Sequence, residues 1–147
     1  MTSAAPLLQV DALQAFYGDA QALFGVALTV SEGEFVTMLG RNGMGKTTTV
    51  RAITGILPPG AGQIRFGGQD ITRLPSHQIA RLGIGLVPEQ RQVFPNLTVY
   101  ENLVATAHNR LGHKQPWTLE RVYRLFPRLK ERAGNLGATL SGGEQQM

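Results

Sequence analysis

The sequence contains no cysteine, which excludes disulfide bonds and thiolate metal sites. It has no apolar run near the roughly 20 residues that a transmembrane helix needs. Its first residues, 1–6, lack the basic and apolar regions of a secretion signal. We therefore expect a cytosolic chain, and other subunits would have to supply any passage through a membrane.

Charge is also sparse, at 16% of 147 residues with a formal net charge of +4. The Lys and Arg residues form no cluster with interleaved aromatics, so we expect a solvated surface and no nucleic-acid partner. Hydrophobic residues, at 42%, suit a folded domain with an apolar core.

Five segments predict strands. Residues 7–10 and 26–30 flank a turn, and residues 63–66 alternate like a half-buried strand before a Gly-Gly turn. Residues 34–39 and 84–87 are almost wholly apolar, which predicts strands covered on both faces. Strands of this second kind are typical of the interior of an α/β domain.

Helical patterns accompany these strands. Residues 46–54 predict a helix that ends at a glycine, and Ser76 is expected to cap a short helix that ends before residue 83. The capping box Thr98-x-x-Glu101 predicts another helix start. A further helix is expected between Pro116 and Pro127, so residues 91–139 are expected to form a small helical insert.

A complete phosphate-binding loop, G-x-x-x-x-G-K-[ST], lies between the predicted strand 34–39 and the helix 46–54. Glycines let such a loop wrap closely and aim its N–H groups at phosphate oxygens, and the helix adds its positive end. Lys46 would reach the β- and γ-phosphates, Thr47 would bind Mg²⁺, and Thr48 would donate another hydroxyl. The nucleotide-binding residues predicted here are Gly40, Arg41, Asn42, Gly43, Met44, Gly45, Lys46, Thr47 and Thr48.

Near the end of the chain, residues 140–145 read Leu-Ser-Gly-Gly-Glu-Gln, and Ser141-x-x-Glu144 is a second capping box. With the phosphate loop, this signature sequence resembles that of the ATP-binding subunits of ABC transporters. The resemblance implies an α/β phosphate-loop NTPase core, a small antiparallel β subdomain and a helical insert, with the C-terminal part of the domain missing. It divides the chain into a core at 1–90, a helical subdomain at 91–139 and the signature at 140–147.

The same resemblance implies further site residues. Ser141, Gly142, Gly143 and Glu144 would bind the γ-phosphate of ATP held by a second ATP-binding subunit, in a head-to-tail homo- or heterodimer. Tyr17 matches the aromatic position that stacks on adenine. Glu89 stands where the family has its Q-loop glutamine, and as a carboxylate it could bind Mg²⁺. ATP and Mg²⁺ are the implied cofactors.

Residues 87–103 resemble the ATP-binding subunit of bacterial branched-chain amino acid importers. This implies a subunit on the cytoplasmic face of the inner membrane that couples ATP hydrolysis to import. Its partners would be transmembrane permease subunits and, indirectly, a substrate-binding protein. There are two alternatives: an ABC ATPase that does not act in transport, or a truncated nucleotide-binding or interaction module.

The family's Walker B carboxylates and switch histidine follow the signature, so the catalytic residues are unknown here. Asp70 and Glu101 are poor substitutes because neither ends an apolar strand. The three histidines, His77, His108 and His113, have no metal-ligand spacing. We expect this chain to bind ATP weakly and to hydrolyse it little, and we expect apolar surface at the centre of its sheet.

Overall fold

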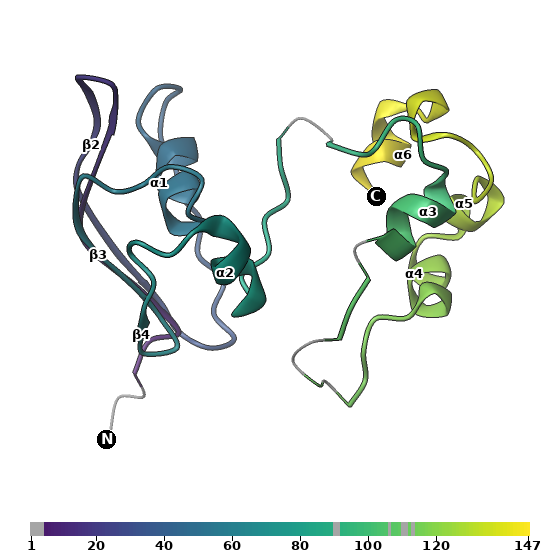
Figure 1. The fold of residues 1–147 in the computed structure, drawn as a ribbon, viewed down its shortest axis with the longest axis horizontal. Coiled ribbons are helices and arrows are strands. Elements are labelled where there is room, and N and C mark those ends of the chain that lie inside the picture. The colour runs from purple at the N-terminus through teal and green to yellow at the C-terminus, as the bar shows by residue number, and fades with distance from the viewer. Residues whose placement is uncertain (1–4, 90–91, 106, 110–111, 113) are drawn as a thin grey trace. The chain divides into compact units, whose positions relative to one another are not determined.

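A computed structural model describes residues 5–89, 92–105, 107–109, 112 and 114–147. The chain divides into two compact units, Met1–Leu86 and Val87–Met147 (Figure 1). The expected boundary of the helical subdomain, between residues 90 and 91, lies outside the described residues.

The first unit is built on a four-stranded sheet of order β2-β1-β3-β4. Its strands are β1 (Leu8–Tyr17), β2 (Ala20–Val30), β3 (Ala61–Phe66) and β4 (Gln69–Asp70), and every pair is antiparallel. This confirms the small antiparallel sheet, although β1 and β2 are longer than the predicted segments. Two-residue turns join β1 to β2 and β3 to β4, and the second turn uses two glycines with positive φ, as tight hairpins prefer.

A bulge in β1 requires a glycine at the opposite position of β3. The pairing register of β1 shifts between Val10 and Leu13 on the β2 side and between Asp11 and Gln14 on the β3 side. Ala12, within both intervals, takes a positive φ of 46°. Gly62 lies opposite this bulge with φ +92°, and a Cβ there would come 2.5 Å from the Ala12 carbonyl oxygen. No side chain fits at residue 62 without moving the backbone of β1.

Two helices pack with this sheet. Helix α1 spans Lys46–Ile53, as predicted, and α2 spans Ser76–Arg81. The expected cap at Ser76 is wrong, because the Pro75 carbonyl already accepts the first helical bonds from the N–H groups of residues 78 and 79. Sheet and helices enclose one core of buried residues: Val10, Leu13, Ala15, Leu23, Ala52, Ile64, Ile71 and Ile79.

The two strands expected to be covered on both faces, 34–39 and 84–87, are not strands in the structure. Phe35 is 92% exposed, Leu39 is 90% exposed, and Val87 is also exposed. A strand forms only where neighbouring backbone pairs with it, and in the described part of the chain no segment pairs with either run. These exposed apolar residues lie outside the sheet, whereas the expected apolar surface was at its centre.

The second unit is helical. It contains α3 (Val99–Ala105), α4 (Leu119–Leu125), α5 (Pro127–Glu131), a short 3₁₀ helix η1 (Gly137–Thr139) and α6 (Gly142–Gln146). The capping box at Thr98 is confirmed, since the Glu101 carboxylate accepts from the Thr98 N–H at 2.8 Å and the Thr98 hydroxyl accepts from the Glu101 N–H at 3.2 Å. Pro127 not only follows the end of α4 but also begins α5.

Among the described residues, no helix is long and apolar enough to cross a bilayer.

Candidate nucleotide-binding site

The glycine loop runs from residue 40 into α1, and two of its glycines have almost the same conformation. Gly43 has φ +84° and Gly45 has φ +83°, values that L side chains rarely adopt. A Cβ on Gly43 would meet nothing within 4 Å, whereas one on Gly45 would lie 2.6 Å from Leu23 Cδ2 of β2. Gly43 therefore sets the shape of the loop without packing against other residues of the described chain, and Gly45 also lets the loop pack against the sheet.

The side chain of Lys46 is folded into the loop that precedes it. Its Nζ donates to the Gly40 carbonyl oxygen at 2.7 Å and to the Arg41 carbonyl oxygen at 2.9 Å. The loop thus curls around an ammonium group. Because an ammonium carries three donors, two are used by the loop and one remains for an anionic oxygen.

Helix α1 begins at this ammonium with its N-terminal amides uncapped by any side chain. Gly45 is the N-cap residue, and the first turn, which lies wholly within the described residues, carries no acidic side chain. Thr49 bonds inward, with its N–H and hydroxyl donating to the Gly45 carbonyl. The positive end of the helix is therefore not neutralised locally, which favours an anion. Thr47 is exposed in this turn, and Thr48 is buried.

Tyr17, at the end of β1, lies beside α1. Its hydroxyl accepts from Arg51 Nη1 at 3.4 Å, and hydrogen bonds from the Thr48 side chain and then Arg51 lower its pKa. The structure therefore brings Tyr17 to the helix that carries the loop. Arg51 was missed by the sequence reasoning, although its i,i+3 spacing from Thr48 places the two on one helix face.

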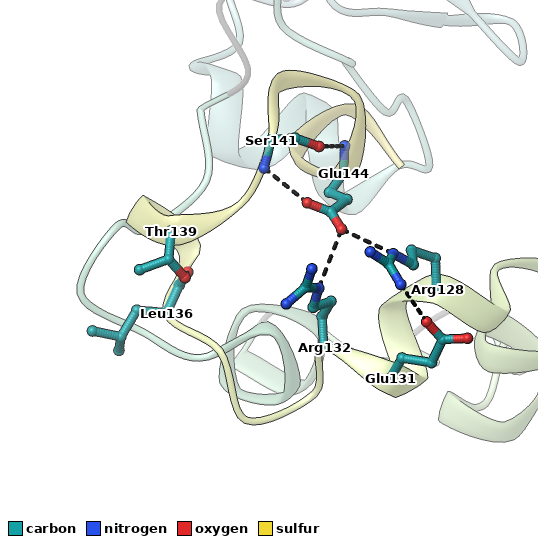
Figure 2. Close-up of polar contacts among 7 residues, drawn as sticks. All are labelled: Arg128, Glu131, Arg132, Leu136, Thr139, Ser141 and Glu144. Carbon is teal, nitrogen blue, oxygen red and sulfur yellow. Dashed lines mark hydrogen bonds and ion pairs between the residues drawn. The ribbon is translucent and has the colours of Figure 1, made fainter.

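The signature sequence lies in the second unit, where Ser141 caps α6. The Ser141 hydroxyl accepts from the Glu144 N–H at 3.3 Å, and the Glu144 carboxylate accepts from the Ser141 N–H at 2.8 Å, so the second capping box is confirmed. The other carboxylate oxygen of Glu144 contacts Arg128 and Arg132, as Figure 2 shows. The hydrogen bonds from Ser141, followed by those arginines, lower the pKa of Glu144 to about 2.

The expected Mg²⁺ ligands belong to different units, Thr47 to the first and Glu89 to the second. Within the described ranges, no three His, Asp or Glu side chains gather as a metal site would require. His77 and His108 are exposed, and His113 lies outside the described residues. The hydroxyl of Thr47, in the first turn of α1, has the oxygen chemistry that Mg²⁺ prefers beside a bound phosphate.

A glycine loop that encloses a lysine and opens an uncapped helix defines a phosphate-loop nucleotide-binding protein. The model of the family described as ABC transporter matches residues 23–147. The chain belongs to the ABC transporter family. The two phosphate-recognition motifs of the sequence, at 40–47 and 140–145, both lie within the matched region.

Curated relatives cover most of this chain. It is 42% identical over 141 residues to the high-affinity branched-chain amino acid transport ATP-binding protein BraG of Pseudomonas aeruginosa, covering 96% of this chain and 60% of that protein. It is 40% identical over 123 residues to the lipopolysaccharide export system ATP-binding protein LptB of Escherichia coli K12, covering 82% and 51%. The chain therefore spans between half and two thirds of the length of these relatives.

Solved structures show the same fold. An ATP-binding subunit of an ABC transporter is 30% identical with a TM-score of 0.76, covering 95% of this chain and 58% of that one. A dimeric bacterial ABC transporter cassette is 26% identical with a TM-score of 0.72, covering 94% and 65%. These likenesses confirm the α/β phosphate-loop ATPase fold class.

Proposed function

We propose that this chain supplies the ATP-binding half-site of an ABC transporter motor that imports branched-chain or related amino acids. The observation that carries the proposal is the loop at residues 40–47, where Lys46 Nζ lies 2.7 Å from the Gly40 carbonyl and α1 begins without a cap. A ligand that carries several anionic oxygens is bound well where many N–H donors and one mobile cation lie close together. A nucleoside triphosphate with Mg²⁺ has that chemistry.

Each element has a role in this proposal. The loop, Lys46 and Thr48 hold the phosphates, and Tyr17 stacks on the adenine. Thr47 binds Mg²⁺. In support, the Tyr17 hydroxyl is held to α1 through Arg51, so the ring and the loop belong to one packed unit.

The second half of the proposal concerns assembly. Ser141, Gly142 and Gly143 face the γ-phosphate of ATP on a second ATP-binding subunit, and closure of that dimer drives transmembrane permease subunits. The motor then lies on the cytoplasmic face of the inner membrane, and a substrate-binding protein delivers the amino acid. Residues 1–90, 91–139 and 140–147 form the core, the helical subdomain and the signature.

Calorimetry with Mg²⁺ and ATP tests the phosphate loop directly. We expect Lys46→Ala to weaken binding at least about 10-fold, because it removes the only charge that the loop encloses. Lys130→Ala is the matched control, since Lys130 is exposed on α5 and should leave binding unchanged. Absence of binding by the wild type, or equal binding by Lys46→Ala, would refute the proposal.

The exported lipopolysaccharide of the LptB system is a second candidate cargo, because that relative is almost as similar as BraG. The BraG match covers more of this chain, which favours amino acid import. Deletion of the gene should reduce uptake of labelled leucine and leave the lipopolysaccharide of the cell surface normal. The opposite result would assign the motor to export.

For residues 1–147 alone, we propose binding with little hydrolysis. Steady-state phosphate release from the pure chain measures this. Robust turnover that disappears in Lys46→Ala would contradict it.

A further inference from the structure

We propose that Arg128 and Arg132 are positioning residues that anchor Glu144 and so set the geometry of the signature at Ser141. The inference rests on the proposed function, because it concerns how the same motor closes on nucleotide. Neither arginine belongs to the two phosphate-recognition motifs, and the sequence reasoning singled out neither of them.

The Glu144 carboxylate joins the start of α6 to the α5 segment of the second unit. Its Oε2 accepts from the Ser141 backbone N–H at 2.8 Å. Its Oε1 lies 3.1 Å from Arg128 Nε and 3.4 Å from Arg132 Nε. Figure 2 shows both arginines converging on Glu144 from the side opposite Ser141. The start of α6 is thereby tied to α5 and to the residue that ends it.

The tie is needed because α6 is short. It spans five residues, and a helix of that length does not hold its own first turn in water. A second hydrogen bond between α6 and the preceding segment runs from Gln145 Nε2 to the Gly137 carbonyl, at 2.9 Å. The contacts of Glu144 with the arginines and of Gln145 with the Gly137 carbonyl start from consecutive residues of α6. The orientation of the N-terminus of α6 therefore depends on them.

The two arginines also offset the negative charge of Glu144 at the start of α6. A glutamate in the first turn stabilises the helix but repels an approaching phosphate. The Glu144 side chain is only 11% exposed, and its arginine partners are 50% and 40% exposed. The two cations cover the carboxylate, and with the neighbouring Glu131, which also pairs with Arg128 at 2.6 Å, the four charges sum to zero. A phosphate approaching Ser141 therefore meets no net negative charge.

A positioning role predicts a specific defect, namely that nucleotide binds normally but fails to drive dimer formation. The experiment uses the protein as its gene encodes it, with binding of Mg²⁺ and ATP followed by calorimetry and ATP-driven dimer formation followed by sedimentation. For Arg128→Gln and Arg132→Gln we expect binding within about twofold of wild type. Dimer formation should need about 3- to 5-fold more protein, the size of effect at the upper end of what a partly exposed charge pair gives.

Glu131→Gln is the matched control, because it removes the other ion pair of Arg128 and leaves Glu144 alone. It should dimerise within about twofold of wild type. Arg128→Gln combined with Glu144→Gln should dimerise no worse than Glu144→Gln alone, since the arginine acts through that carboxylate. These two variants separate anchoring of Glu144 from a general loss of surface charge.

Three results would overturn the inference. Wild-type dimerisation by the arginine variants would show that the anchor is unimportant. Parallel losses of ATP binding and dimerisation would show that the arginines support folding only. Additive losses in the double variant would show that they act elsewhere. Failure of the wild type to bind ATP is a separate outcome, which would overturn the proposed function itself.

Discussion

The sharpest test of the phosphate loop compares Gly43→Ala with Gly45→Ala. The two glycines differ by one degree in φ, +84° and +83°, but only Gly45 has a neighbour where a Cβ would go. Any difference between the two variants therefore measures contact with the sheet and not backbone conformation. The assay is the free energy of unfolding, measured in urea by far-UV circular dichroism.

The magnitude follows from two terms. An L residue in the left-handed region costs about 1–2 kcal/mol, and both variants carry that cost. At Gly45 the added methyl would also lie 2.6 Å from Leu23 Cδ2, and Leu23 is only 2% exposed, so it has little room to move. Overpacking of this kind costs about 1–3 kcal/mol more. We expect Gly45→Ala to be less stable than Gly43→Ala by about 1–3 kcal/mol.

A double-mutant cycle identifies the contact. Leu23→Ala removes Cδ2 and costs about 2–5 kcal/mol by itself. Combined with Gly45→Ala, it should cost less than the sum of the two, because the clash has gone. Equal stability of the two glycine variants, or strict additivity in the cycle, would refute the argument that residue 45 is glycine because of β2.

Three further outcomes are expected. Gly62→Ala should destabilise the sheet by about 1–3 kcal/mol more than Gly68→Ala in urea unfolding, because only Gly62 faces backbone oxygens of β1; equal losses would contradict the bulge argument. Tyr123→Phe should raise the free energy of unfolding by up to about 1 kcal/mol, since the buried Tyr123 hydroxyl has no hydrogen-bond partner among the described residues; a clear loss would show that it has one. Hydrogen bonds from Thr72 and then Gln63 lower the Asp70 pKa from 3.8 to about 2. The stability advantage of wild type over Asp70→Asn should therefore be full above pH 4 and vanish as pH falls towards 2. An advantage that is independent of pH would exclude this carboxylate as its source.

Features that depend on neighbours in the sequence could be predicted. The capping boxes at Thr98 and Ser141 each need a hydroxyl and a carboxylate three residues apart, and the start of α1 at Lys46 needs only the glycine loop before it. The alternation of residues 63–66 also predicted β3. In each case the interacting groups lie within one turn or one strand of each other.

Features that depend on distant partners could not be predicted. Residues 34–39 have the composition of a buried strand, yet Phe35 and Leu39 are exposed, because composition cannot supply the neighbouring backbone that a strand needs. Arg128 is 16 residues from Glu144, and its role depends on the turns between α5 and α6. Arg51 is 34 residues from Tyr17, and it reaches that ring only after the sheet has packed against α1.

The two helix starts to which the proposed function assigns phosphate recognition differ in a way that implies an order of events. At α1, the amides are uncapped, no acid lies in the first turn, and Lys46 adds a full positive charge. At α6, a serine and a glutamate already satisfy the helix start, and arginines offset the glutamate. The first element has the N–H donors and the positive charge to bind an anion by itself. In the second element, the capping box of Ser141 and Glu144 already accepts hydrogen bonds from the N–H groups at the helix start, and the helix spans only five residues. In the dimer that we propose, nucleotide therefore binds first at the loop of one subunit, and Ser141 of the other contributes only after the phosphate is already in place.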